Sequence, residues 1–378
     1  MIFSSWLTTV SNRIFNASAR KRLGRKFNGR RVAQLAGEIG SSTSSAPLSG
    51  DIRASLWHTF SVAPQFHRDS RRFQSQVWNT SDLSRASERL EDRTLLTLFV
   101  TYAGTGNALT LSEASGGADN VTVSEMAANT LRIDLGAATF DAGSSTAAGL
   151  TYEMAGDPAN SNFVDVDITN AGAISTLNVN LGNNGDTAVI GTVDNNGVTN
   201  ISVDLGNGAD VLTLNAVTIP GALSVTSEGI TNAGALVIAG ATTVSAGSND
   251  VTLTQAANNF SSIAVTGSNV DITDANGVVL AAISATTLDV IASGAVTQSA
   301  AAVVSGATTV TATGNNVTLT QSSNNFSSIA VTGSNVDITD TNAVVLAAIG
   351  ATTLDVVAGG AVTQSAAAVV SGATTVTA

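Results

Sequence analysis

The chain has 378 residues, of which 12% are charged and 4% aromatic, and it contains 35 glycines and no cysteine. Fifteen of its 16 Lys and Arg residues lie in 1–95, whereas residues 96–378 carry Arg132 alone against 21 Asp and Glu residues. Such an acidic body repels phosphates, which argues against nucleic acid as a partner, and the missing cysteine excludes disulfide bonds and thiolate metal sites. No run of 18 apolar residues occurs, so no membrane span is predicted.

Residues 1–80 are predicted to form a basic, mostly disordered extension. A short apolar stretch, Met1–Leu7, precedes the clustered Lys and Arg residues. A secretory signal has the opposite order, so the segment is either a disordered tail or an export or targeting extension. A nucleic-acid-binding arm is a third alternative, although no folded reading surface accompanies it. The change in charge further predicts that the mature protein begins after the Leu90–Leu96 element, or at least that residues 1–80 do not pack on the body.

Residues 81–96 are predicted to contain a short amphipathic helix followed by a sorting motif. The spacing of Leu83, Ala86 and Leu90 places these side chains on one helical face. The stretch Leu90–Leu96 resembles the Leu-Glu-Pro-Arg-x-Leu-Leu element near the start of large secreted repeat proteins of planctomycete-like bacteria, although Asp92 takes the place of proline. The resemblance implies an adhesin-like or filamentous-haemagglutinin-like β-helical body and an exported protein sorted by its basic segment. The residues that match the motif are Leu90, Glu91, Arg93, Leu95 and Leu96.

Residues 97–175 are predicted to form an irregular β cap or small β domain. Apolar residues alternate there with Thr, Ser or Asp, which indicates strands with one buried and one wet face. The spacing between these strands is irregular, as in a segment that covers the first coil of a solenoid. The predicted strands are 108–112, 120–124, 130–135 and 163–169.

Residues 176–378 are predicted to form a right-handed parallel β-helix. The segment 241–306 recurs as 307–372 with 55 of 66 positions identical, and shorter similarities 22 residues apart divide each unit into three. Such periods are typical of solenoids, and parallel crossovers are right-handed by default. We therefore expect coils of about 22 residues within a 66-residue super-repeat.

The alternation within the repeats predicts which side chains face inward. Two sets of apolar residues are expected in the core, namely Val244, Val251 and Leu253 in one coil and Leu288, Val290 and Val296 in another. Four Thr-Thr pairs are expected to stack on successive or alternate coils. The Gly-containing clusters at 247–249, 267–269, 293–294 and 333–335 are expected to supply the positive φ angles of the corners.

One motif suggests a metal site. The segment Leu205–Thr213 is similar to the calcium-binding nonapeptide of toxin-type β-rolls, with Leu205 in place of its first glycine, and a poorer copy ends at Asp186. Calcium requires six to eight oxygen ligands, so Asp186, Asn207 and Asp210 on adjacent coils are candidate calcium ligands. The alternative is that Asp186 and Asp210 are two solvated corner carboxylates. No other cofactor is predicted.

No catalytic arrangement is recognisable in the sequence after residue 95. The acids of the repeats stand singly between Thr and Val, whereas polysaccharide-active β-helices need clustered carboxylates. We therefore expect a non-enzymatic, extracellular or cell-surface adhesin-like protein that contacts cell-surface or matrix components, including polysaccharide. The alternatives are a calcium-binding matrix protein and, less favoured, a β-helical polysaccharide-active enzyme. The acids in question are Asp250, Asp271, Asp274 and Asp289.

The last residues, 373–378, begin a further repeat without a polar capping segment. Open strand edges are templates for further pairing. This ending predicts either a fragment of a longer repeat array or end-to-end self-association.

Overall fold

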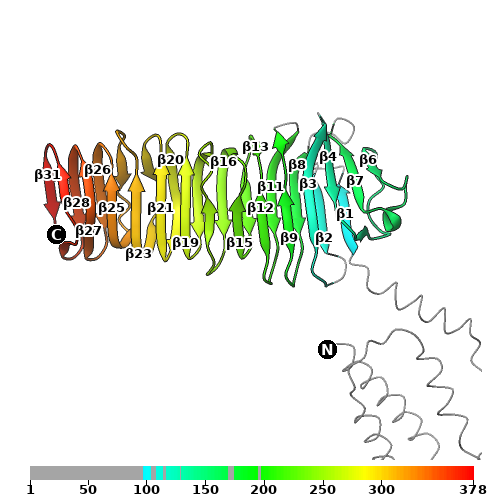
Figure 1. Cartoon of the computed structure of the whole chain (residues 1–378), viewed down its shortest axis with the longest axis horizontal. Coiled ribbons are helices and arrows are strands. Elements are labelled where there is room, and N and C mark those ends of the chain that lie inside the picture. The colour runs from blue at the N-terminus through cyan, green and yellow to red at the C-terminus, as the bar shows by residue number, and fades with distance from the viewer. Residues whose placement is uncertain (1–96, 104–107, 114–115, 128, 169–173, 195–196) are drawn as a thin grey trace, which may run out of the picture. The chain divides into compact units, whose positions relative to one another are not determined.

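The computed structural model describes residues 97–378 except 104–107, 114–115, 128, 169–173 and 195–196 (Figure 1). The predictions for 1–80 and 81–96, including the motif residues Leu90, Glu91, Arg93, Leu95 and Leu96, lie outside the described residues. So does part of the proposed cap. The division of the chain at residue 175 therefore stays a prediction.

The described residues form strands almost throughout. The first are β1 (Thr97–Ala103), β2 (Ala108–Glu113), β3 (Asn120–Ala127), β4 (Thr130–Asp134), β5 (Thr139–Phe140), β6 (Leu150–Tyr152), the 3-10 turn η2 (Pro158–Asn160) and β7 (Phe163–Asp167). Next come β8 (Ile174–Asn180), β9 (Thr187–Ile190), β10 (Val193–Asp194), β11 (Val198–Asp204), β12 (Val211–Leu214), β13 (Val217–Ile219), β14 (Leu223–Thr226) and β15 (Gly229–Asn232).

The repeat region continues this pattern. Its strands are β16 (Leu236–Ser245), β17 (Val251–Leu253), β18 (Asn259–Thr266), β19 (Asn269–Asp274), β20 (Val278–Ala285), β21 (Thr287–Ala292), β22 (Val296–Gln298), β23 (Ala302–Thr311), β24 (Val317–Leu319), β25 (Asn325–Thr332), β26 (Asn335–Asp340), β27 (Val344–Ala351), β28 (Thr353–Ala358), β29 (Val362–Gln364), β30 (Ala368–Val370) and β31 (Thr374–Thr377).

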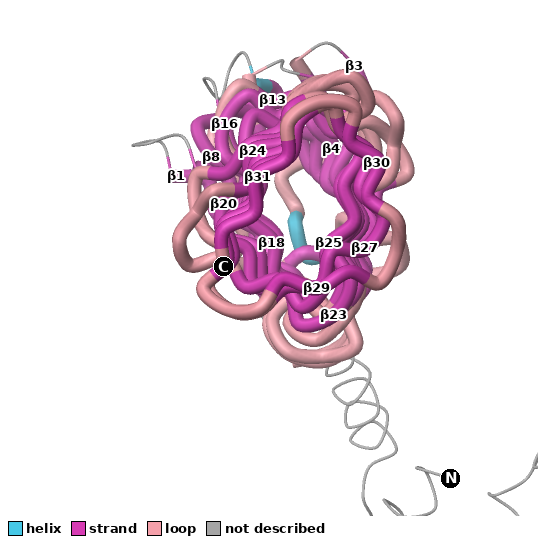
Figure 2. The backbone as a smooth tube through the Cα atoms, turned by 90° about the vertical axis from the view of Figure 1, so that its left-hand side faces the viewer, coloured by secondary structure: helices cyan, strands magenta, loops and turns pink. Residues whose placement is uncertain are grey.

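From β8 onward the strands form a parallel β-solenoid of about ten turns, as predicted. Each strand pairs in parallel with the corresponding strand of the next coil; for example, β11 pairs with β8 on one side and with β14 on the other. Figure 2 looks along the axis from the C-terminal end. There the chain passes counter-clockwise from β29 through β30 to β31 as it approaches the viewer, which makes the solenoid right-handed. No helix in the described residues is long and apolar enough to cross a membrane.

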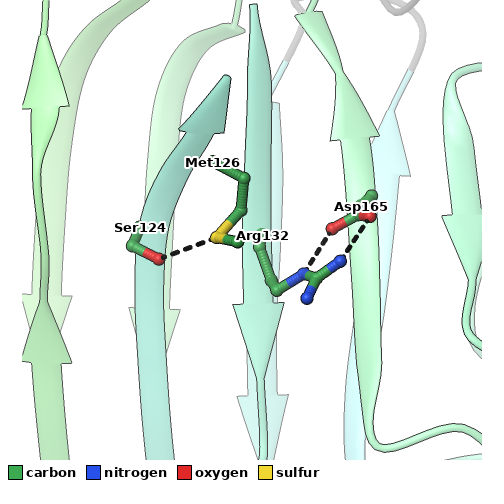
Figure 3. A network of polar contacts seen from close by, with 4 residues as sticks. All are labelled: Ser124, Met126, Arg132 and Asp165. Carbon is green, nitrogen blue, oxygen red and sulfur yellow. Dashed lines mark hydrogen bonds and ion pairs between the residues drawn. The ribbon is translucent and has the colours of Figure 1, made fainter.

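The N-terminal end of the solenoid is closed by antiparallel strands. Strand β4 pairs antiparallel with β3 and with β7, and β6 pairs antiparallel with β7. Arg132 on β4 forms a two-bond ion pair with Asp165 on β7 (Figure 3). Strands β2 and β3 also pair in parallel with β8 and β9, so these N-terminal strands continue into the first coil of the solenoid.

The core consists of the inward-facing apolar side chains, and the alternation of the sequence identifies them correctly. The six residues that were expected inside are all at most 2% exposed. Phe260 and Phe326 are also buried and lie beside Ile238 and Val304 of the preceding coil rather than on one another. Full burial of an aliphatic side chain contributes about 1.5–3 kcal/mol. The residues predicted to face inward were Val244, Val251, Leu253, Leu288, Val290 and Val296.

The coil length varies, which makes the predicted stacking of Thr-Thr pairs wrong. Thr242 pairs with Ile263, and Thr308 pairs with Leu288. Both threonines are 1% exposed. Because the coils are not all 22 residues long, equivalent positions of the two 66-residue units lie in different stacks. The stack of Ser245 continues through Thr266 and Ser284 to Val303. Its counterpart Thr311 instead lies in the stack of Thr273 and Ile291.

Only some corner glycines have the predicted backbone conformation. Gly247 has a φ of 57°. Gly267 and Gly333 do not have a positive φ, and a Cβ atom at either would lie 3.0 Å from a valine methyl group of the preceding coil. Glycine at these two positions therefore suits close packing between coils and not a left-handed turn.

Candidate functional site

Four acidic residues lie one above another on successive coils, and we call them the acidic column: Asp119, Asp186, Asp210 and Glu228. The pairing register of the strands stacks the four acids, because each acid directly precedes a strand residue that pairs with its counterpart on the next coil. Asn120 pairs with Thr187, Thr187 with Val211, and Val211 with Gly229. The column thus runs from the antiparallel N-terminal strands into the first coils of the solenoid.

Backbone amides bind one side of the column. The amide of Asp119 donates to Oδ1 of Asp186, and the amide of Asp186 donates to Oδ1 of Asp210, both at 2.8 Å. The amides of Asp210 and Gly208 bind the carboxylate of Glu228 in the same way. Each coil is therefore joined to the next by a side-chain to backbone hydrogen bond, which satisfies an amide that no strand partner reaches.

The other side of the column has no hydrogen-bond donor. Asp119, Asp186 and Asp210 are 5%, 0% and 2% exposed. Their Oδ2 atoms and Oε2 of Glu228 are buried without a partner. The alternative of two solvated corner carboxylates at Asp186 and Asp210 is therefore wrong. The alternation that directs Ala188 of β9 and Leu212 of β12 inward extends to the acid two residues before each of them, because Thr187 and Val211 between them are exposed.

Burial and mutual repulsion change the protonation of the column. Burial, together with the charges of Asp186 and Glu113, raises the pKa of Asp119 to about 7. Burial also raises the pKa of Asp186, and burial and the contact with Glu228 raise the pKa of Asp210 to about 6. Burial also acts to raise the pKa of Glu228. Hydrogen bonds from Asp210 and from backbone amides outweigh this effect, so the pKa of Glu228 is lowered.

Asn207, the third predicted calcium ligand, is exposed at the tip of its turn, whereas Asp186 and Asp210 are buried. Its Nδ2 donates to Oδ1 of Asn183 on the preceding coil at 3.3 Å. The two turns approach closely, since a Cβ atom at Gly208 would lie 1.6 Å from the carbonyl oxygen of Asn184. Glycine is therefore required at position 208. Within the described ranges, no three His, Cys, Asp or Glu side chains are grouped to hold a metal ion, and the calcium site of Asp186, Asn207 and Asp210 stays a prediction.

Two surface hollows meet at Glu228. The larger, of about 590 Å³, is lined by residues that include Asp210, Glu228 and Asp250, and the second, of about 260 Å³, lies between Gly206 and Asn249. Asp210 is buried and is nevertheless among the residues that line the larger hollow. The hollow therefore lies against the C-terminal end of the column.

A second acidic feature lies on the outer surface, and we call it the Thr–Asp ladders. Thr252 pairs with Asp271, Asp271 with Asp289, and Asp289 with Thr309. The second unit repeats this order with Thr318, Asp337, Asp355 and Thr375. The prediction that the repeat acids stand singly is thus wrong for Asp271 and Asp289, because a residue that is isolated in the sequence has a carboxylate opposite it on the next coil.

Asp119 and Glu228 were missed by the sequence analysis, although a signal for them exists. Asp119, Asp186 and Asp210 each directly precede a short alternating strand, and Glu228 precedes the strand that begins at Gly229. A search for an acid directly before each strand would have found all four. The irregular spacing between Asp119 and Asp186 obscured their shared position.

Comparison with known proteins supports the repeat architecture and assigns no activity. A family model described as repeats of unknown function (DUF5649) matches residues 198–266, 267–332 and 333–378. No curated protein matches the chain, and no solved structure matches it. The three matched segments cover the part of the solenoid that follows the first coils.

Proposed function

We propose that this repeat β-solenoid is an extracellular or cell-surface structural protein that makes weak, repeated contacts through its polar outer faces and catalyses no reaction. The Thr–Asp ladders carry the proposal. They place hydroxyl and carboxylate groups in register on consecutive coils, and each ladder recurs in the second 66-residue unit. A partner that is itself a polymer, such as a matrix polysaccharide, offers hydroxyl groups that can bind several of these positions at once.

Charge supports this choice of partner. The described solenoid exposes carboxylates, and from residue 133 onward the sequence contains no Lys, Arg or His. Anionic polymers are therefore repelled, whereas neutral polysaccharides carry hydroxyl groups that both donate and accept hydrogen bonds. The similarity of Leu90–Leu96 to a sorting element supports the extracellular location.

The proposal is tested by binding and by location. Immunolabelling of intact source cells should detect the protein, and mild external protease should remove the signal. The purified full chain should bind neutral polysaccharide particles, and Asp271→Ala combined with Asp337→Ala should reduce the bound fraction, whereas Asp194→Ala outside the ladders should not. Unlabelled intact cells, equal binding by the double variant, or release of reducing sugar by the protein would each contradict the proposal.

A further inference from the structure

We propose that the larger hollow binds a hydrated divalent cation through the carboxylates of Asp210 and Glu228. The inference does not depend on the proposed surface function. It rests on the contact between two carboxyl groups, on the two oxygen atoms that lack a donor, and on the surface hollow that both residues line.

The register brings the two carboxyl groups together. Gly229 pairs with Val211, and the amide of Gly229 donates to the carbonyl oxygen of Asp210 at 2.9 Å. Asp210 and Glu228 therefore occupy the same position on neighbouring coils, about 4.8 Å apart along the axis. Their side chains are in contact, and a hydrogen bond can join them only if one of the two carries a proton.

When both groups are ionised, no basic side chain within the described residues neutralises them. Oδ2 of Asp210 and Oε2 of Glu228 are buried and have no donor. The other charged groups around them are acids: Asp186 precedes Asp210 in the column, and Asp250 lines the hollow. Arg132, which is the basic residue within the described ranges, is bound to Asp165. Two adjacent buried charges of the same sign are unfavourable unless a counterion is present.

A cation that keeps part of its hydration shell fits this environment better than a cation that is enclosed by protein ligands alone. Magnesium usually keeps several water molecules and is bound through one or two carboxylates, and calcium accepts water among its six to eight oxygen ligands. The hollow of about 590 Å³ leaves room for such water. Oδ1 of Asp250 accepts hydrogen bonds from the backbone and side-chain nitrogens of Asn269 at 3.1 and 2.8 Å, so the proposal assigns Asp250 a contribution through its charge alone.

The proposed site differs from the one suggested by the nonapeptide similarity. Asn207 is exposed and bound to Asn183, and Oδ1 of Asp186 is bound to Asp119. The position next to Asp210 on the following coil is Glu228, which also lines the hollow. The site is therefore displaced by one coil toward the C-terminus.

The experiment is equilibrium dialysis of the full chain against magnesium and, separately, calcium at neutral pH, in about 150 mM NaCl to screen the exposed acids. We expect one saturable site with a dissociation constant of about 10⁻⁴ to 10⁻³ M for at least one of the two ions, as in other sites with few protein ligands. Glu228→Gln and Asp210→Asn should each weaken this site at least about tenfold. Asp194→Asn removes an exposed charge outside the hollow and should leave binding unchanged.

Circular dichroism of each variant tests whether a loss of binding arises from a loss of folding. An amide at position 228 can donate to Asp210, so Glu228→Gln should melt no lower than the wild type in the absence of divalent ions. The proposal is overturned if neither ion shows saturable binding up to about 10 mM, or if Glu228→Gln binds as tightly as the wild type. Loss of binding in Asp186→Asn but not in Glu228→Gln would place the site between Asp186 and Asp210 and would also overturn it.

Discussion

Arg132 on β4 donates from Nε and from a terminal nitrogen to the two carboxylate oxygens of Asp165 on β7, at 2.7 and 2.8 Å. Its guanidinium group also lies 3.8 Å from the centre of the Phe163 ring. These contacts join two of the antiparallel strands that close the N-terminal end of the solenoid. They add a side-chain link to the backbone pairing of β4 with β7.

We expect Arg132→Lys to weaken this end of the protein although the charge is kept. Lysine can form neither the two parallel hydrogen bonds nor the same stacking on Phe163, and the loss should be about 1 kcal/mol for a partly exposed pair. Hydrogen exchange should accelerate in β4 and β7 and remain unchanged in β25. Asp194→Asn is the matched control. Equal acceleration in all strands would show that the effect is not local.

Each 66-residue repeat contains a buried asparagine at a corner of the solenoid. Asn324 is 0% exposed. Its Nδ2 donates to the carbonyl oxygens of Leu319 and Thr339, and its Oδ1 accepts from the amide of Ala302. Asn258 occupies the equivalent position in the first unit and accepts from Leu236 in the same manner. The side chain thus takes the place of a strand partner where the chain turns.

We therefore predict that Asn324→Leu, which keeps the approximate volume, destabilises the protein by about 2–4 kcal/mol, because it leaves several buried backbone groups without partners. Thermal unfolding monitored by far-ultraviolet circular dichroism measures the effect. Asn335→Ala, at an exposed position on the following strand, should change the midpoint far less. Similar midpoints for the two variants would show that the buried hydrogen bonds contribute little.

The outer ladder makes an electrostatic prediction. Asp271 and Asp289 lie opposite each other, and burial followed by the charge of Asp271 raises the pKa of Asp289. Like charges in direct register are destabilising. Thr309→Lys places a cation opposite Asp289 and should raise stability by about 0.2–1 kcal/mol. The gain should shrink at high salt, whereas Thr243→Lys, on another stack, should give no such salt-dependent gain. A gain that is independent of salt would exclude charge as its cause.

The sequence predicted the parallel coils and the inward residues well because alternation and repetition are local properties. Val251 and Val290 could be assigned to the core from their immediate neighbours alone, and both are fully buried. The acidic column could not be assembled in this way, because Asp119 and Asp186 become neighbours only through the pairing of Asn120 with Thr187. The Thr stacks failed for a related reason, since small differences in coil length accumulate and change which residues meet.

The last prediction concerns pH. The folded state holds Asp119 against Asp186 and Glu113, and burial followed by these charges raises the pKa of Asp119 to about 7. In the unfolded chain the value is about 3.9. The folded state therefore binds the proton more tightly, so the contribution of Asp119 to stability is complete below about pH 4 and is lost as the pH rises through about 7. Asp186 and Asp210 shift in the same direction.

Asp119→Asn separates the contribution of Asp119 from that of the other acids, because an amide stays neutral throughout this range. In buffer that contains a chelator of divalent ions, the wild type should become less stable between about pH 4 and 7. The part of this loss that Asp119 causes should be on the order of 1 kcal/mol after solvent screening. The variant should show a smaller slope. Hydrogen exchange at Thr187, whose amide donates to the carbonyl oxygen of Asp119 at 2.9 Å, reports the same change locally. Parallel pH profiles for the wild type and the variant would mean that Asp119 is already ionised in the folded protein and that the column tolerates its charge.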